Sequence, residues 1–279
     1  MPLGADIGIF AVSLGAGVVG ALAGVGGGVF VVPALTLLFG VDIRLAIGAS
    51  IVSVIATSSG SAAAYVRDQM TNLHIGMFLE LATVTGAIGG ALLTSIVAPQ
   101  LLFVTLGLVL IGSAVLQVIR LADVPAPSVE PSASAIRLGL VGSYPDRNLG
   151  RTIAYSPIRI PLGFVLMGFA GLVSGLLGIG SGALKVLAMD GAMGLPIKVS
   201  SATSNFMIGV TAAASAGIYL SRGDVDPRIA APVALGVLGG AVIGARILPH
   251  LSNRSARLVF VPVLVLIGLQ TLARGLGIA

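Results

Sequence analysis

Long apolar segments separated by short polar stretches make up most of this chain. The segments lie at about 7–23, 29–40, 45–66, 74–97 and 101–119, and again at about 162–177, 183–194, 199–220, 228–248 and 256–273. A membrane-spanning helix needs about 20 predominantly apolar residues. The pattern therefore predicts an all-α polytopic membrane protein.

Composition argues against a soluble enzyme or a nucleic-acid-binding module. Of the 279 residues, 56% are hydrophobic and only 9% are charged, against about 25% charged residues in an ordinary soluble domain. The net charge of +5 resides mostly in loops, where membrane topology explains it. We therefore expect a lipid bilayer as the surroundings and no nucleic-acid partner.

A polar stretch divides the apolar segments into two sets. Residues 121–160 are rich in Pro, Ser and Arg, and Ile136 to Ile158 alternates loosely enough for a small β-hairpin. We predict a first membrane repeat over 1–120, a cytoplasmic linker over 121–160 and a second membrane repeat over 161–279.

The second set repeats the first at a shift of about 154 residues. The shift places Gly24-Val-Gly-Gly-Gly28 on Gly178-Ile-Gly-Ser-Gly182 and Arg44 on Lys198. It also places three polar residues on three others: Ser50, Thr57 and Ser61 on Ser204, Thr211 and Ser215. Coincidence of a glycine cluster, a basic residue and a polar stripe favours a duplication over chance matching.

Loop charge favours an inverted repeat. Loop 98–100 has no basic residue, whereas its counterpart at about 246–257 has three arginines, and basic loops favour the cytoplasm. Segments 29–40 and 183–194 are too short to span, so we expect each half to hold one glycine-broken hairpin and three full spans. The linker is then cytoplasmic and both termini are outside, although Arg222 and Arg228 would also lie outside.

The paired glycine clusters are the first candidate site. Broken membrane helices are tolerated where they line a cavity or are buried in protein, and helix N-termini at such breaks bind anions. We predict substrate contacts at Gly26, Gly27, Gly28, Gly180, Ser181 and Gly182. The alternative is a close helix crossing that needs glycine.

A polar stripe follows each cluster. Ser50, Ser53, Thr57 and Ser61 share one helix face through spacings of 3, 4 and 4 residues. We predict that the substrate contacts Ser50, Thr57, Ser204, Asn205 and Thr211. The alternative is hydrogen bonding and close packing between helices.

Three charged residues lie inside apolar segments. Lys185 follows Gly182 by three residues, and Asp190 and Glu80 are acidic. Such charges are costly in a membrane and are usually functional, so we predict that Lys185 binds the anion and that Glu80 or Asp190 takes part in coupling. A Lys185–Asp190 pair, a snorkelling Lys185 and an interfacial Glu80 are the structural alternatives.

No motif for catalysis or for a cofactor is apparent in the sequence. The chain has no Cys, its two histidines are at loop edges, and neither HExxH nor GxxxxGK[ST] occurs. We therefore predict no catalytic residue, no metal, no cofactor and no enzymatic activity.

Two runs resemble the TauE/SafE family of membrane transporters, often called sulfite exporters. They are Gly24-Val-Gly-Gly-Gly-Val-Phe-Val-Val-Pro-Ala-Leu35 and Gly194-Leu-Pro-Ile-Lys-Val-Ser-Ser-Ala-Thr-Ser-Asn205. The resemblance covers the chain except the linker and implies transport of sulfite, sulfoacetate or related anions. The chain departs from the family pattern at Ser181, where a third Gly is usual, and at Leu187, where Pro is common.

Residues and resemblance together predict a secondary transporter in a prokaryotic inner membrane. We expect export of a small sulfur-containing anion by alternating access around the two hairpins. An anion channel or an uptake permease for another small anion is the alternative. The identity of the anion, the coupling ion and a homodimeric state are left open by the sequence.

Overall fold

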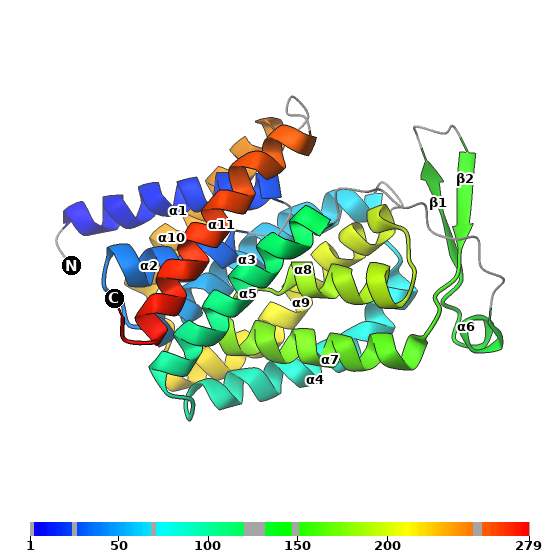
Figure 1. Cartoon of the computed structure of the whole chain (residues 1–279), viewed down its shortest axis with the longest axis horizontal. Helices are drawn as coiled ribbons and strands as arrows, with labels where there is room; N and C mark the ends of the chain where they lie inside the picture. Colours follow the sequence, from blue (N-terminus) through cyan, green and yellow to red (C-terminus); the bar gives the residue numbers. More distant parts are fainter. Residues whose placement is uncertain are drawn as a thin grey trace.

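A computed structural model describes residues 3–23, 27–67, 71–119, 132–146, 151–247 and 253–278 (Figure 1). The helices of the first half are α1 (Leu3–Ala23), α2 (Gly28–Leu38), α3 (Ile43–Arg67), α4 (Leu73–Thr94) and α5 (Pro99–Ile119). The linker contributes α6 (Ala133–Arg137), β1 (Gly142–Asp146) and β2 (Arg151–Tyr155). The second half contains α7 (Ile160–Leu177), α8 (Gly182–Val186), the π-helical turn η1 (Leu187–Ala192), α9 (Ile197–Arg222), α10 (Pro227–Ile247) and α11 (Asn253–Gly275).

The predicted all-α membrane class is confirmed. Within the described residues, four helical stretches are long and apolar enough to cross a membrane: Leu73–Thr94, Pro99–Leu116, Ile160–Leu177 and Pro227–Gly244. The predicted segments match the helices to within a few residues. Hydrophobic patterning alone therefore located the membrane helices.

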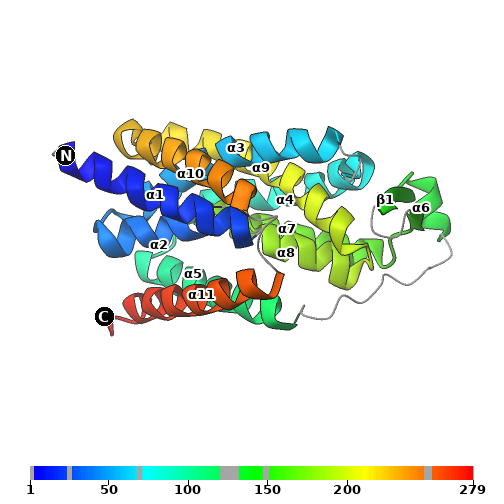
Figure 2. The ribbon, with the colours of Figure 1, turned by 90° about the horizontal axis from the view of Figure 1, so that it is seen from above.

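The helices pack in pairs that join one half to the other. Helix α1 packs on α10, α4 on α7, α5 on α11 and α3 on α9 (Figures 1 and 2). The sequence repeat equates α1 with α7 and α4 with α10, so the first two pairs are equivalent to each other. The packing scheme is thus the same when the two halves are exchanged.

Glycine makes these pairs close. A Cβ added at Gly90 of α4 would lie against the backbone of Leu172, and one at Gly240 of α10 against the backbone of Leu14. Gly90 and Gly240 are equivalent in the repeat. Small residues let helix backbones approach where lipid supplies no hydrophobic drive for association.

Both termini lie at one end of the bundle, and the β1–β2 hairpin projects from the other (Figures 1 and 2). At the end with the termini, three arginines hydrogen-bond to backbone carbonyls. Arg44 donates hydrogen bonds to the carbonyl oxygens of Ser95 and Val97, each at 3.3 Å. Arg222 donates to the carbonyl oxygen of Ala91 at 2.6 Å. Arg274 donates to the carbonyl oxygen of Thr36 at 2.5 Å. Arg222, which argued against the predicted topology, therefore has a structural role at the end of α4.

The predicted linker hairpin is confirmed, and the linker also holds a helix that was not predicted. Strands β1 and β2 pair antiparallel from Gly142 opposite Tyr155 to Asp146 opposite Arg151. The Tyr155 hydroxyl accepts a hydrogen bond from Asn72 at 2.9 Å, which ties the hairpin to the start of α4. Burial raises the pKa of Tyr155. The short helix α6 escaped prediction because five residues carry no clear periodicity.

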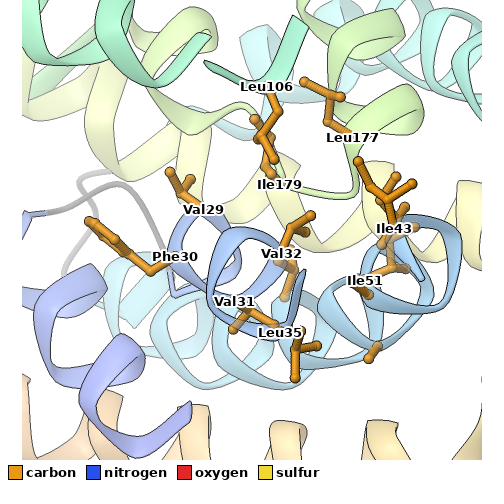
Figure 3. Packing of buried hydrophobic residues seen from close by; sticks show 14 of the residues in the cluster. Val29, Phe30, Val31, Val32, Leu35, Ile43, Ile51, Leu106, Leu177 and Ile179 are labelled. Atoms are coloured by element: carbon orange, nitrogen blue, oxygen red, sulfur yellow. The ribbon is translucent and has the colours of Figure 1, made fainter. Parts of the chain in front are cut away.

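Helix α2 is surrounded by protein, as expected of a hairpin limb and not of a span. Its Val29, Val31, Val32 and Leu35 are each no more than 2% exposed. Figure 3 shows Val29 and Val32 on the side of α2 that faces Leu106 of α5 and also Leu177 and Ile179 of the second half, and Val31 and Leu35 on its opposite side. Eleven helical residues reach about 16 Å, about half the hydrocarbon thickness of a bilayer. The tip of the second hairpin therefore packs against α2.

Candidate functional site

The two glycine turns meet at one serine. The Ser50 hydroxyl lies 3.1 Å from the carbonyl oxygen of Gly28 and 2.8 Å from that of Gly178, so its single proton is shared between the two halves. Gly178 ends α7 in a left-handed conformation with φ of +64°. The stripe residue Ser50 thus holds both turns together, as the packing alternative had proposed.

The repeat-related serine makes the corresponding bond in the second half. The Ser204 hydroxyl donates to the carbonyl oxygen of Gly182 at 3.2 Å, as Ser50 does to that of Gly28. In both halves the helix after the hairpin fixes the residue that opens its second limb. The polar stripe consequently has a structural function at its first position in each half.

Ser181 lies in the second turn in a strained conformation. Its φ of +46° is in the left-handed region, where residues other than Gly are uncommon. Its hydroxyl oxygen is buried and has no hydrogen-bond partner. A buried polar atom without a partner is costly, so the Ser181 hydroxyl is available to a ligand at the tip of the hairpin.

Lys185 is completely buried behind this turn. Its side chain is 0% exposed, and its Nζ donates a hydrogen bond to Oγ1 of Thr211 at 2.6 Å. Thr211 Oγ1 lies in turn 2.6 Å from Oε1 of Glu80 and 2.8 Å from the carbonyl oxygen of Met207. A lysine of α8, a threonine of α9 and a glutamate of α4 thus form one chain of contacts, which we call the Lys185–Thr211–Glu80 relay.

The relay changes two of the sequence interpretations. Glu80 is only 7% exposed and accepts a hydrogen bond from Thr211, so its carboxylate faces the interior of the bundle. Lys185 reaches an acidic residue through Thr211, and that residue is Glu80 of a distant helix. Glu80 is therefore the acidic residue that Lys185 contacts through Thr211, whereas the sequence had suggested a pair with Asp190, a half-buried residue of η1.

Glu80 also faces a cavity of about 430 Å³ between α4 and α9. The lining is apolar apart from Glu80 and Thr85, and consists of Met77, Glu80, Leu81, Val84, Thr85, Phe206 and Val210. Met77 and Leu81 are more than 60% exposed, so the cavity opens on the outer surface of the bundle. The second carboxylate oxygen of Glu80, Oε2, is buried and has no hydrogen-bond partner.

The remaining predicted residues lie in the two turns and along α3 and α9. Gly26 lies outside the described residues, whereas Gly27, Gly28, Gly180 and Gly182 are buried in the turns. Thr57 and Asn205 are half-buried, and the Thr57 hydroxyl donates within its own helix to the carbonyls of Ser53 and Val54. Sequence reasoning singled out all three relay residues. It missed that they touch, because 131 residues separate Glu80 from Thr211.

Similarity to known proteins agrees with this architecture. The family model of the sulfite exporter TauE/SafE matches residues 9–271. The chain belongs to the TauE/SafE family. This TauE/SafE protein is 28% identical over 268 residues to the probable membrane transporter protein YunE of Bacillus subtilis, covering 94% of this chain and 95% of YunE. It is also 28% identical over 251 residues to the probable membrane transporter protein YdhB of the same organism, covering 86% of this chain and 90% of YdhB.

No solved structure matches the chain. The family and its apolar helices identify the protein as a multi-pass membrane transporter. Its relatives are described as transporters and not as enzymes, in line with the sequence expectation.

Proposed function

We propose that this TauE/SafE protein is a secondary transporter that exports small sulfur-containing anions such as sulfite or sulfoacetate. The observation that carries the proposal is the full burial of Lys185 beside the second glycine turn. A buried ammonium group has to be offset by negative charge. A sulfite or sulfonate group presents several acceptor oxygens to one cation, and charge-assisted hydrogen bonds are the stronger kind.

The proposed substrate site lies at the tip of the second hairpin. Lys185 supplies the charge, and the hydroxyls of Ser181 and Thr211 supply donors. The other predicted contacts would shape the substrate site or hold the turns in place. They are the glycines of the two turns together with Ser50, Thr57, Ser204 and Asn205. The Ser50 bond to Gly178 supports this division, because it joins the two hairpins.

We propose alternating access between two inverted-topology repeats. The equivalence of the α1–α10 and α4–α7 pairs supports two related halves that rock against each other. The termini and the linker hairpin lie at opposite ends of the bundle (Figure 2), which fits an odd number of crossings in each half. The linker would be cytoplasmic, the membrane would be a prokaryotic inner membrane, and two chains would form a homodimer.

A stabilisation screen on purified protein tests the substrate class. We expect sulfite, thiosulfate or sulfoacetate to raise the unfolding temperature in a saturable manner. Taurine carries an amine beside its sulfonate and should do so less. Chloride at equal ionic strength is the control, and equal stabilisation by all anions would contradict the proposal.

Flux in proteoliposomes separates a transporter from the alternative of an anion channel. A transporter gives saturable uptake of labelled sulfoacetate that trapped unlabelled sulfoacetate accelerates. A channel gives a current proportional to voltage and no such acceleration. An outcome of the second kind would replace the transporter by a channel.

The Cys-free chain allows a direct test of topology. Single cysteines placed at Pro99 and at Asn253, the first residues of α5 and α11, should react with a membrane-impermeant maleimide from opposite sides. A variant with cysteine at Ser143 of β1 marks the linker side. Labelling of positions 99 and 253 from the same side would contradict an inverted repeat.

A further inference from the structure

We propose that Glu80 is a proton site that competes with the substrate anion for Lys185 and Thr211, so that binding of an anion is accompanied by uptake of a proton at Glu80. This inference rests on the proposed anion site at Lys185. It assigns Glu80 a ligand of its own, the coupling proton.

The first support is that the relay is already filled by a carboxylate. Thr211 Oγ1 is 2.6 Å from Lys185 Nζ and 2.6 Å from Glu80 Oε1. Thr211 thus accepts from the ammonium while its single hydroxyl proton is directed toward Glu80 or the Met207 carbonyl. With Glu80 ionised, the carboxylate occupies the place of an anion next to the buried cation.

The second support is charge balance inside the bundle. Lys185 and ionised Glu80 together carry no net charge, so a monoanion entering beside them leaves one uncompensated negative charge. Burying an unpaired charge is costly. If Glu80 is protonated, Lys185 offsets one charge of the entering anion instead: a monoanion then leaves the site neutral, and a dianion such as thiosulfate or sulfoacetate leaves one uncompensated negative charge where it would otherwise leave two.

The third support is the free oxygen of Glu80. Oε2 is buried, lacks a hydrogen-bond partner, and belongs to a residue that lines the cavity of about 430 Å³. A proton that adds to Oε2 forms the neutral acid. The Thr211 hydroxyl proton is then released from the carboxylate and turns to an oxygen of the anion, while Lys185 keeps all its protons. Leaving of the anion and loss of the proton from Oε2 restore the starting state.

Other charged groups lie farther along the elements that pack on Glu80. On α4 itself the described titratable neighbour is His74 in the first turn, and η1 contributes Asp190. Helix α9 has Lys198 in its first turn and Arg222 in its last turn, and α7 has no charged residue between Ile160 and Leu177. Lys185 is therefore the charged side chain to which Glu80 is connected, through the Thr211 hydroxyl.

Proton uptake on binding is the decisive measurement. Purified protein in weak buffer with a pH-indicator dye is titrated with thiosulfate and with sulfoacetate, both fully ionised near neutral pH. We expect uptake of about one proton per bound anion at a pH where free Glu80 is ionised, and an anion affinity that falls about tenfold per pH unit above that range. The sign follows because the protonated form binds the anion, so a rise in pH removes the competent form.

Glu80→Gln replaces the carboxylate by a neutral group of the same shape. This variant should bind the anion as tightly at high pH as at low pH and should take up no proton. The matched control is Asp42→Asn, the same change at the cap of α3, where Asp42 accepts from the Arg44 amide at 2.8 Å. Asn caps helices as well as Asp does, so Asp42→Asn should keep proton uptake and pH dependence unchanged.

The outcomes separate this inference from the proposed function. If wild-type protein binds an anion without proton uptake, the coupling role of Glu80 is overturned and the anion site stands. If Glu80→Gln keeps the wild-type pH dependence, another group is the proton site and the inference again fails. If neither anion binds at any pH, the proposed function fails and this inference fails with it. The wild-type titration decides whether binding takes up a proton even if Glu80→Gln does not fold. In that case Glu80→Asp, which keeps the acid but shortens the side chain, should shift the pH range of proton uptake, and an unchanged pH range would overturn the assignment to Glu80.

Discussion

Val31 in the first half and Lys185 in the second occupy the same position of the repeat, three residues after the last glycine of each turn. Around them the halves agree on backbone fixation, because Ser50 bonds to Gly28 as Ser204 bonds to Gly182. The halves differ in the side chain that lies beside the turn. Val31 is 1% exposed within an apolar cluster, whereas Lys185 is 0% exposed and bonds to Thr211.

The difference extends to the other two relay positions. Thr57 is the repeat mate of Thr211, and the hydroxyl of each bonds to the carbonyl four residues back, while Thr211 also contacts Lys185 and Glu80. A shift of about 150 residues, which aligns Gly89 and Gly90 with Gly239 and Gly240, places Ala230 at the position of Glu80. Features common to both halves therefore hold the hairpins in place. Polar residues found in one half alone are the ones to examine for substrate binding.

A substitution that makes the second half like the first at Lys185 should affect anion binding most. Lys185→Met should lower anion affinity more than about 100-fold, which is about 3 kcal/mol, because the site loses its cation. Binding is measured by calorimetry with sulfoacetate on protein that remains monodisperse in detergent. Lys185→Arg should weaken binding without abolishing it, since the charge stays but the donor geometry changes.

Lys198→Met is the matched control for this substitution. Lys198 is a half-buried lysine at the start of α9, and its replacement should leave anion affinity within about threefold of wild type, below the roughly 0.7 kcal/mol that threefold represents. Normal binding by Lys185→Met would mean that the asymmetry between the halves is structural. Loss of binding in both variants would point to general basicity and not to the relay.

Close helix contacts should behave alike in the two halves. Gly90→Ala and Gly240→Ala each place a Cβ against the backbone of a partner helix. Overpacking of this kind costs about 1–3 kcal/mol. We expect both to lower the unfolding temperature in detergent by similar amounts. The measurement is a thermal unfolding curve followed by intrinsic tyrosine fluorescence or by aggregation.

Adjacent glycines supply the controls for that experiment. A Cβ at Gly89 or at Gly239 would meet nothing within 4 Å, and Ala is a better helix former than Gly. Gly89→Ala and Gly239→Ala should therefore be neutral or slightly stabilising. A large loss in only one half would show that the α1–α10 and α4–α7 contacts are not energetically equivalent.

Several parts of the fold could be predicted because their signals are local. Apolar run length located the helices, the glycine clusters located the hairpin turns, and loose alternation after Ile136 located the linker strands. The sequence shift aligned Ser204 with Ser50 and Gly182 with Gly28, and the structure shows the same bond in both pairs. Each of these signals is contained in a short stretch of sequence or in the comparison of two such stretches.

The partner of Lys185 could not be predicted, for a physical reason. Helix α4 is apolar on all sides, so its hydrophobic pattern does not reveal which face meets protein and which meets lipid. Rotation of α4 by half a turn would send Glu80 into the membrane and away from Thr211. The close contact of α4 with α7 through Gly86 and Gly90 fixes that rotation, and it depends on packing between distant segments.

The hydrogen bonds of Ser50 and Ser204 to the carbonyls of the hairpins should contribute unequally to stability. Ser50 reaches two carbonyls, at 3.1 Å in its own half and at 2.8 Å in the other, whereas Ser204 reaches the Gly182 carbonyl at 3.2 Å. A buried hydrogen bond contributes about 0.5–1.5 kcal/mol, and a bond between the hairpins also fixes their relative position. Ser50→Ala should therefore lower the free energy of unfolding by about 1–2 kcal/mol and Ser204→Ala by about half as much. Chemical unfolding in a detergent–denaturant titration measures both, with Ser95→Ala, an exposed serine that bonds within α4, as the control. Equal losses at Ser50 and Ser204 would mean that the Gly178 contact adds nothing, and the joint between the two hairpins would then rest on apolar packing around Val29 and Ile179.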